Sequence, residues 1–268
     1  MALRPPRRAR PAQSTQPPDL GSRLSRIVSL VPSITELVCE LGLAGELVGR
    51  TGFCIHPKEL LKGTPKVGGT KSVNLKKLRA LSPTHVIVNV DENTRETAEA
   101  LAGFVPNLIV THPLAPLDNL ALYRQIGAAF GKTREAEALC VRFETAFREA
   151  QKRNSPQRKV LYLIWKDPWM TVARDTYISR MLAVFGFHTL PVDAGDRYPK
   201  LTLEEPWIGD ADLVLLSSEP YRFRDAHLRE IGKLVGKPAF LIDGEMTSWY
   251  GSRAIQGLRY LSDFSTSL

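Results

Sequence analysis

The sequence contains no apolar run of the roughly 20 residues that a membrane-spanning helix needs. Its cysteines, Cys39, Cys54 and Cys140, are few, odd in number and far apart, which excludes a framework of disulfides. A sustained excess of one charge is also missing, although the formal net charge is +8. Residues 1–26 hold six arginines and one aspartate, whereas the remainder carries 30 basic and 27 acidic residues. A nearly neutral body argues against specific nucleic-acid binding.

Residues 1–25 are rich in proline and arginine and offer almost no side chains to bury, so we expect a disordered basic tail. No apolar segment of the kind found in a secretory signal follows its positive charges. Together with the unpaired cysteines, this favours a cytoplasmic protein. The alternative is a periplasmic protein whose start has been misassigned.

The rest of the chain alternates between strand-like and helix-like segments, which is typical of parallel sheets covered by helices. After a first strand, an apolar stripe at helical spacing starts near Ser33 and stops at Gly42 or Gly45. We expect the other strands at 84–90, 107–113, 159–165, 212–217 and 239–243. We expect the other helices at 75–81, 92–104, 133–154, 175–186, 224–234 and 252–264.

The helix expected over 133–154 has one uninterrupted apolar stripe and a length of about 33 Å. It separates two runs of alternating elements. The predicted fold class is therefore α/β, with two Rossmann-like lobes whose parallel sheets are joined by one long backbone helix. The predicted divisions are a lobe at 26–131, the linking helix at 132–155 and a second lobe at 156–268.

Motifs for covalent chemistry are weak in this sequence. Cys54 and His56 could both ligate a metal, but two residues do not complete a four-coordinate site. Asp91 and Glu92 follow a strand and open a helix, where acidic residues act either as a general base or as a helix cap. Neither pair identifies an enzyme.

Polar and aromatic residues instead gather where the expected strands end. In open parallel sheets, ligands bind beyond the carboxyl ends of the strands. Aromatic rings offer area and stacking faces to a bulky ligand, and arginine offers a fork to a carboxylate or phosphate. The strand-end candidates are Ser33, Phe53, Thr70, Lys71, Asn89, Asn93, Arg95, Trp165, Arg174, Tyr198, Trp249, Tyr250 and Arg253.

Two stretches, RIVSLVPSITELVCELGLAGELVGRT and PKVGGTKSVNLKKLRALSPTHVIVNV, resemble the N-terminal lobe of class III periplasmic binding proteins, the helical-backbone metal receptors. The resemblance runs from about residue 26 to 264. It implies two α/β lobes bridged by a long helix, with a cobalamin or iron chelate held between the lobes.

The cobalamin-binding branch implies aromatic contacts at Phe53, Tyr198, Trp249 and Tyr250, followed by Arg253. Two tryptophans of that branch fall at Thr70 and Asn89, and its acidic C-terminal residue falls at Ser248. The family docks on arginines of a membrane permease through one glutamate per lobe. The C-terminal one matches Glu204, whereas Lys76 stands at the N-terminal position and reverses the charge, which weakens the case for an ABC permease as partner.

Our leading hypothesis is a soluble receptor-like protein for a bulky small molecule, a corrinoid such as cobalamin first, then haem or an iron chelate. The rings would stack on the ligand, Lys71, Arg95, Arg174 and Arg253 would meet anionic groups, and two asparagines would hydrogen-bond. No catalytic cofactor is required. One alternative is a cytoplasmic enzyme that uses Asp91, Glu92, His56 or Cys54 in the same cleft. The other is an ABC importer subunit with a misassigned start.

Overall fold

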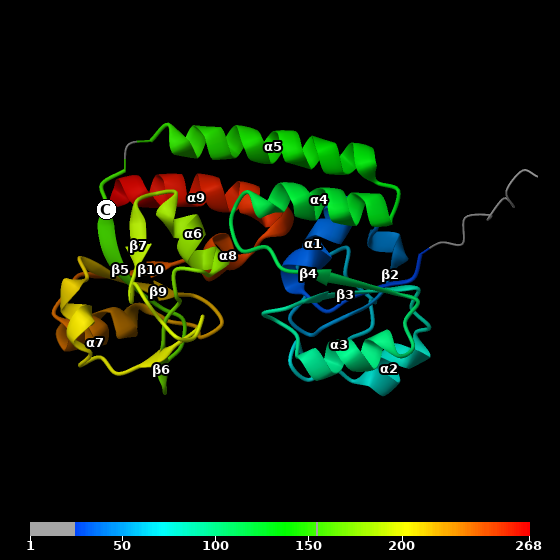
Figure 1. Ribbon diagram of the computed structural model, residues 1–268, viewed down its shortest axis with the longest axis horizontal. Helices are drawn as coiled ribbons and strands as arrows, with labels where there is room; N and C mark the ends of the chain where they lie inside the picture. The colour runs from blue at the N-terminus through cyan, green and yellow to red at the C-terminus, as the bar shows by residue number, and fades with distance from the viewer. Residues whose placement is uncertain (1–24, 154) are drawn as a thin grey trace, which may run out of the picture.

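The N-terminal lobe is built on a four-stranded parallel sheet in the order β2-β1-β3-β4. The computed structural model describes residues 25–153 and 155–268 (Figure 1). The expected tail therefore lies outside the described residues, apart from Ser25. The elements of this lobe are β1 (Ile27–Ser29), α1 (Pro32–Glu40), η1 (Ala44–Glu46), β2 (Leu47–Arg50), α2 (Leu75–Ala80), β3 (His85–Asn89), α3 (Arg95–Ala102), β4 (Asn107–Thr111) and α4 (Asp118–Ala129).

Side chains alternate between the two faces of this sheet because successive residues of a strand point in opposite directions. Ile27 and Ile87 belong to the largest hydrophobic cluster, which α1, α4 and α5 (Thr133–Gln151) cover. Val28 and Val86 belong to a separate cluster that includes Leu78 of α2. Both faces are thus buried, as a parallel sheet requires.

The C-terminal lobe repeats this arrangement with the parallel order β10-β9-β5-β7 and a two-stranded antiparallel ribbon, β6-β8. Tyr162 and Leu215 face the largest cluster, whereas Leu161 and Val214 face a cluster that includes Ile231 of α7. The elements are β5 (Arg158–Leu163), β6 (Trp169–Met170), α6 (Tyr177–Ala183), β7 (Phe187–Thr189), β8 (Lys200–Leu201), η2 (Pro206–Asp210), β9 (Leu213–Ser217), α7 (Asp225–Val235), β10 (Ala239–Ile242), α8 (Gly244–Ser248), η3 (Gly251–Arg253) and α9 (Ala254–Ser267).

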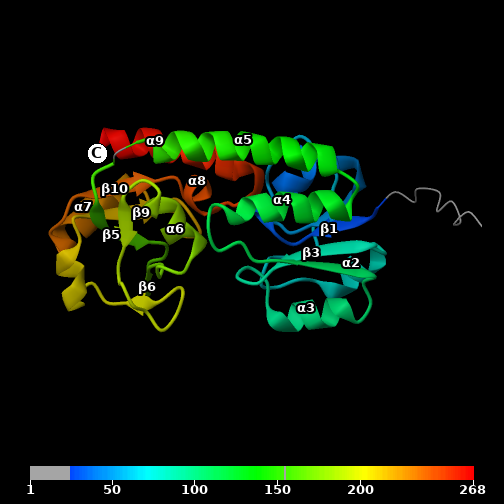
Figure 2. The ribbon, with the colours of Figure 1, turned by 45° about the horizontal axis from the view of Figure 1, so that its top comes forward.

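One long helix, α5 (Thr133–Gln151), spans both lobes along one side of the molecule (Figure 1). It packs against α4 and against α9, and it runs alongside α9 in the turned view (Figure 2). The largest hydrophobic cluster continues beneath it, from Ile27 in the first sheet through Phe143 to Leu213 in the second. The lobes therefore share a core, which limits how far one can rotate against the other.

These elements confirm the predicted fold class, including the long linking helix. The main differences lie at Leu47–Arg50 and Phe187–Thr189, which form the edge strands β2 and β7, whereas the sequence pattern predicted no strand at either place. A strand of four residues is too short to show a period, and Gly42, with a φ of 77°, has already ended the preceding helix. Within the described part of the chain, none of the helices combines the length and apolarity that crossing a bilayer requires.

Replacing two helical glycines by alanine is predicted to change the stability of the protein in opposite directions, because only one of them is tightly packed. A Cβ on Gly257 of α9 would lie 2.3 Å from the backbone oxygen of Met246, whereas a Cβ on Gly232 of α7 would have 3.6 Å to its nearest neighbour. We expect Gly257→Ala to lower the free energy of unfolding by about 1–3 kcal/mol through overpacking. We expect Gly232→Ala to raise it by about 0.5–1 kcal/mol through helix propensity. Urea denaturation measures both, and equal effects of the same sign would contradict this packing.

Candidate functional site

The turn after β3 is shaped by two buried asparagines. The Asn89 amide donates to the Thr111 carbonyl (3.0 Å), and its oxygen accepts from the backbone N–H of Asp91 (2.8 Å). The Asn93 oxygen accepts from the backbone N–H of Asn89, and its amide donates to the carbonyl of Thr70 (3.0 Å). The hydrogen bonds of both amides thus fix the backbone of this turn. The expectation that they bond a ligand stays a prediction.

This turn presents Asp91 to the C-terminal lobe. Arg197 Nη1 lies 2.7 Å from Asp91 Oδ1, and the Tyr198 hydroxyl donates to Asp91 Oδ2 (3.3 Å). His112, just after β4, lies 2.8 Å from Arg197 Nη1, and Lys71 donates to the backbone carbonyl of Asp91 (2.6 Å). Burial, with Asp91 as a second cause, raises the pKa of Tyr198. These residues tie the ends of β3 and β4 to the loop between β7 and β8.

The neighbouring Glu92 makes a second contact between distant segments. It accepts a hydrogen bond from the hydroxyl of Tyr250 (2.5 Å). Burial raises the pKa of Glu92 to about 7, against the lowering effect of that hydrogen bond. On the C-terminal side, Glu219 accepts from Ser248 Oγ (2.8 Å) and Trp249 Nε1 (2.7 Å), and burial raises its pKa as well. Two poorly solvated carboxyl groups therefore lie on either side of the Trp249–Tyr250 pair.

Arg253 completes the buried contacts between the lobes around Trp249 and Tyr250, which we call the seam. Its guanidinium binds both oxygens of Glu36 on α1 (2.7 and 2.9 Å) and one oxygen of Glu245 on α8 (2.7 Å). His56 Nε2 lies 3.3 Å from the same Glu245 carboxylate, and its ring meets that of Trp249 edge-on. The side chain of Arg253 is 9% exposed, so in this structure its fork is occupied by protein carboxylates.

The sequence interpretation placed Trp249, Tyr250 and Arg253 on the lip of a ligand site, and this contact with a ligand stays a prediction. Trp249 and Tyr250 are 8% and 7% exposed and fill the seam between the lobes. Gly251 has a φ of 80°, and a Cβ there would lie 3.2 Å from the carbonyl of Ser33. The aromatics, the glycine and the arginine are together because this segment packs against α1, a role that its sequence pattern does not distinguish from ligand contact.

Two predicted aromatics are open to solvent, one in each lobe. Phe53 follows β2 and is 63% exposed, and Trp165 follows β5 and is 38% exposed. Trp165 meets Tyr221, which follows β9, in an edge-on contact with ring centroids 5.8 Å apart. Exposed large rings that follow strands of a parallel sheet are available for stacking on a ligand.

The remaining candidates are dispersed. Arg95 pairs with Glu99 along α3, and Arg174 donates to the carbonyl of Thr189. The hydroxyl of Ser33 is buried without a hydrogen-bond partner in this structure. Glu204 is exposed on the C-terminal lobe.

The weak metal candidates do not form a site here. The Cys54 thiol is buried, and burial raises its pKa, which disfavours the thiolate that a metal requires. It lies 3.1 Å from the Thr51 hydroxyl, whereas His56 faces Glu245. Across residues 25–153 and 155–268, no group of three or more possible ligands gathers around a common point.

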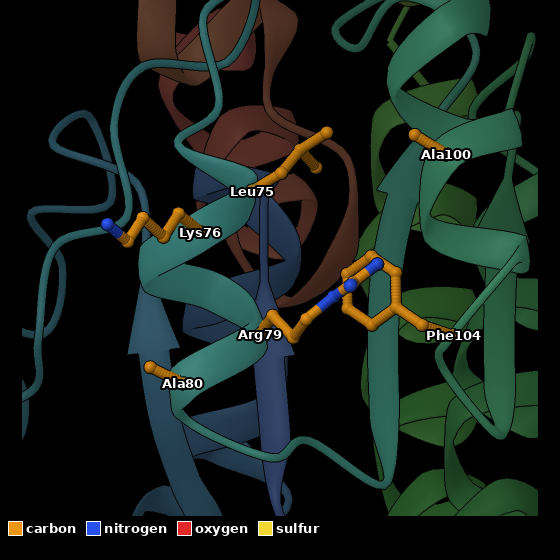
Figure 3. Close-up of a pocket in the computed structure, with 6 residues that line it drawn as sticks. All are labelled: Leu75, Lys76, Arg79, Ala80, Ala100 and Phe104. Carbon is orange, nitrogen blue, oxygen red and sulfur yellow. The ribbon is translucent and has the colours of Figure 1, made fainter.

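Hollows open on the surface of both lobes. One, of about 520 Å³, lies between α2 and α3, where the Arg79 guanidinium covers the ring of Phe104 at 4.3 Å and Lys76 lies at the rim (Figure 3). The other, of about 500 Å³, is in the C-terminal lobe and includes Tyr198 and Trp207 in its wall. Tyr198 thus connects the second hollow to the contact with Asp91.

This architecture, two parallel-sheet lobes spanned by one helix, defines a class of two-lobed binding proteins. A family model described as periplasmic binding protein matches residues 27–235, so the chain belongs to that family. It is 24% identical over 265 residues to the uncharacterized ABC transporter substrate-binding lipoprotein YvrC of Bacillus subtilis (strain 168), covering 93% of this chain and 82% of the relative. It is 22% identical to the vitamin B12-binding protein of Pectobacterium carotovorum subsp. carotovorum (strain PC1), covering 73% and 72%.

Solved structures show the same fold. The periplasmic vitamin B12 binding protein BtuF of Vibrio cholerae superposes with a TM-score of 0.78 at 14% identity, covering 91% of this chain and 97% of that one. The apo form of the periplasmic heme-binding protein RhuT from Roseiflexus sp. RS-1 gives a TM-score of 0.75 at 24% identity, again covering 91% and 97%.

These relatives correct one expectation and bear on another. The prediction of a cytoplasmic protein is wrong. The matching family is described as periplasmic binding protein, and a relative whose alignment covers 93% of this chain is described as an ABC transporter substrate-binding lipoprotein. Both findings point to an extracytoplasmic location. The matching family and the curated relatives are binding proteins, so the chain is a substrate-binding protein and not an enzyme. Burial, with the nearby Glu219 as a smaller cause, accounts for the raised pKa of Glu92 without catalysis, against the lowering effect of the hydrogen bond from Tyr250.

The raised pKa of Glu92 predicts a pH-dependent difference between the wild type and Glu92→Gln. A carboxyl group whose folded pKa exceeds its unfolded value of 4.5 binds more protons when folded, so its contribution to stability falls as pH rises from 4.5 to about 7. Glutamine stays neutral and still accepts from Tyr250. We expect the variant to gain on the wild type across that range, by roughly 2–3 kcal/mol in total.

Thermal melts from pH 5 to 8 measure this gain. The matched control is Glu137→Gln, which removes a carboxylate from an exposed pair with Arg124, where we expect no such increase. A difference between Glu92→Gln and wild type that does not change with pH would contradict a pKa near 7.

Proposed function

We propose that this protein is the binding subunit that holds a tetrapyrrole between its two lobes, a corrinoid such as cobalamin first and haem second. The observation that carries this proposal is the pair of exposed aromatics, Phe53 and Trp165, which follow β2 in one lobe and β5 in the other. A macrocycle with a large apolar surface matches such rings, because packing on aromatic faces needs no directional polar partner.

The relatives support the same choice of ligand. Vitamin B12-binding proteins cover about seven tenths of this chain, and solved proteins with this fold bind vitamin B12 or haem. Tyr198 adds a half-buried ring between the C-terminal hollow and the Asp91 contact. Lys71 and Arg174 provide positive charge on exposed loops of the two lobes.

Delivery to an ABC permease is part of the proposal. Glu204 is exposed where the resemblance implies a docking glutamate. Lys76 is exposed on α2 where it implies a second one, so a permease that accepts this chain needs an acidic partner at that position.

Aromatic stacking predicts that removing either exposed ring weakens binding of cyanocobalamin. We expect Phe53→Ala and Trp165→Ala each to raise its Kd by about 3- to 10-fold, the magnitude of one stacking contact. Absorbance titration measures the Kd.

Phe104→Ala is the matched control, because Phe104 lies in the hollow between α2 and α3 and contacts Arg79 (Figure 3). The same titrations with haemin decide between the two ligands. If neither compound binds the wild type, or if Phe104→Ala weakens binding as much as the other two variants do, the proposed function is wrong.

A further inference from the structure

Arg197 is the cation through which the loop between β7 and β8 contacts the N-terminal lobe. We propose that Arg197 selects ligands that carry an anionic group, and that Asp91 occupies the place of that group while the protein is empty. The inference rests on the proposed function, because it concerns a ligand held between the same lobes.

The groups around the Asp91 carboxylate are those that would bind an anionic group of a ligand. Arg197 Nη1 lies 2.7 Å from Asp91 Oδ1, and the Tyr198 hydroxyl donates to Asp91 Oδ2 (3.3 Å). His112 Nε2 lies 2.8 Å from Arg197 Nη1 and 3.4 Å from Asp91 Oδ1. An arginine, a phenol and an imidazole thus converge on one carboxylate, as they would on a carboxylate or phosphate of a ligand.

The two partners are held by different lobes. The backbone of Asp91 is fixed by Asn89 and Lys71 in the N-terminal lobe. The Arg197 guanidinium keeps a second acidic neighbour in its own lobe, since its Nε lies 3.6 Å from Asp175 Oδ2. A small separation of the lobes would therefore part Asp91 from Arg197 and leave Arg197 oriented.

Exposure separates this contact from the seam around Arg253. The side chains of Arg197 and Asp91 are 25% and 22% exposed, whereas that of Arg253 is 9% exposed. A partly hydrated ion pair contributes little net stability, because water screens it and both partners are well solvated when apart. An anionic group of a ligand can therefore replace Asp91 on Arg197 at a low cost in free energy. Replacing Glu36 on the buried Arg253 would cost more, because the carboxylate would lose its partner in a poorly solvated place.

Two ligand chemistries fit this exchange, and matched pairs of probes separate them. Haemin carries carboxylates that its dimethyl ester lacks. Cyanocobalamin carries a nucleotide with a phosphodiester, a ribose and a benzimidazole, and dicyanocobinamide lacks this nucleotide. In each pair the ring system stays the same, so the part of the affinity difference that depends on Arg197 reports the anionic group.

The test is a double-substitution series titrated with all four probes. Because any ligand that separates the lobes must break the Asp91–Arg197 pair, we expect Asp91→Asn to bind every accepted ring system about 3- to 10-fold more tightly. In the Asp91→Asn background, we expect Arg197→Gln to weaken the anionic member of an accepted pair by about 10-fold and to leave the neutral member unchanged. Arg197→Lys in that background should keep part of the preference, because it keeps the charge without the fork.

Hydrogen exchange of the ligand-free proteins adds a measurement that needs no ligand. We expect residues 190–199 to exchange faster in Asp91→Asn than in wild type or in the control Glu137→Gln. Unchanged exchange there would overturn the contact between the lobes.

Equal weakening of both members of a pair by Arg197→Gln in the Asp91→Asn background would overturn selection of an anion. Unchanged affinities in Asp91→Asn would overturn the exchange with Asp91. If none of the four probes binds any of the proteins, the proposed function fails and anion selection fails with it. Faster exchange would then show a structural contact only.

Discussion

The packing of the segment Tyr250–Arg253 against the N-terminal lobe is the constraint on which the relation of the two lobes depends. Arg253 places one guanidinium between Glu36 of α1 and Glu245 of α8, with three short hydrogen bonds and little exposure. Such an arrangement is costly to break, since either carboxylate would be left poorly solvated without its partner. The backbone of Gly251 is held as well, by the Tyr123 hydroxyl (2.8 Å) and the Asn119 side chain (2.6 Å).

Two kinds of contact between the lobes follow from this arrangement. The buried ones, around Arg253 and beneath α5, join the lobes through little-exposed ion pairs and through the largest hydrophobic cluster. The contact of Asp91 with Arg197 and Tyr198 is partly hydrated and joins loops at the ends of strands. Small movements are therefore compatible with the second contact and not with the first. A receptor built in this way can admit a ligand with modest motion, without a large hinge rotation.

The sequence was sufficient for the sheets and the long helix, because their signals are local. Alternating buried strands and an unbroken apolar stripe over 133–154 predict two parallel-sheet lobes and a linking helix, and α5 is present at Thr133–Gln151. The edge strands β2 and β7 were not predicted, because strands of four and three residues carry too little pattern. The site could be predicted only in part. Phe53 and Trp165 are exposed after their strands, and their contact with a ligand stays a prediction.

The contacts of Tyr250 and Arg253 could not be predicted from the sequence near them. Their partners Glu92 and Glu36 lie 158 and 217 residues away along the chain, and only the folded structure brings them together. Asn89 and Asn93 illustrate the same limit, since a polar residue after a strand can as readily shape the backbone as face a ligand. Composition cannot distinguish these cases because the side chain is equally polar in both.

The most direct measurement is a crystal structure of the protein grown with saturating cyanocobalamin. The account predicts density for the corrin ring between the lobes, in contact with Phe53 and Trp165, with the bidentate pair of Arg253 and Glu36 intact. Corrin density only on an outer surface, such as the hollow between α2 and α3, would contradict it (Figure 3).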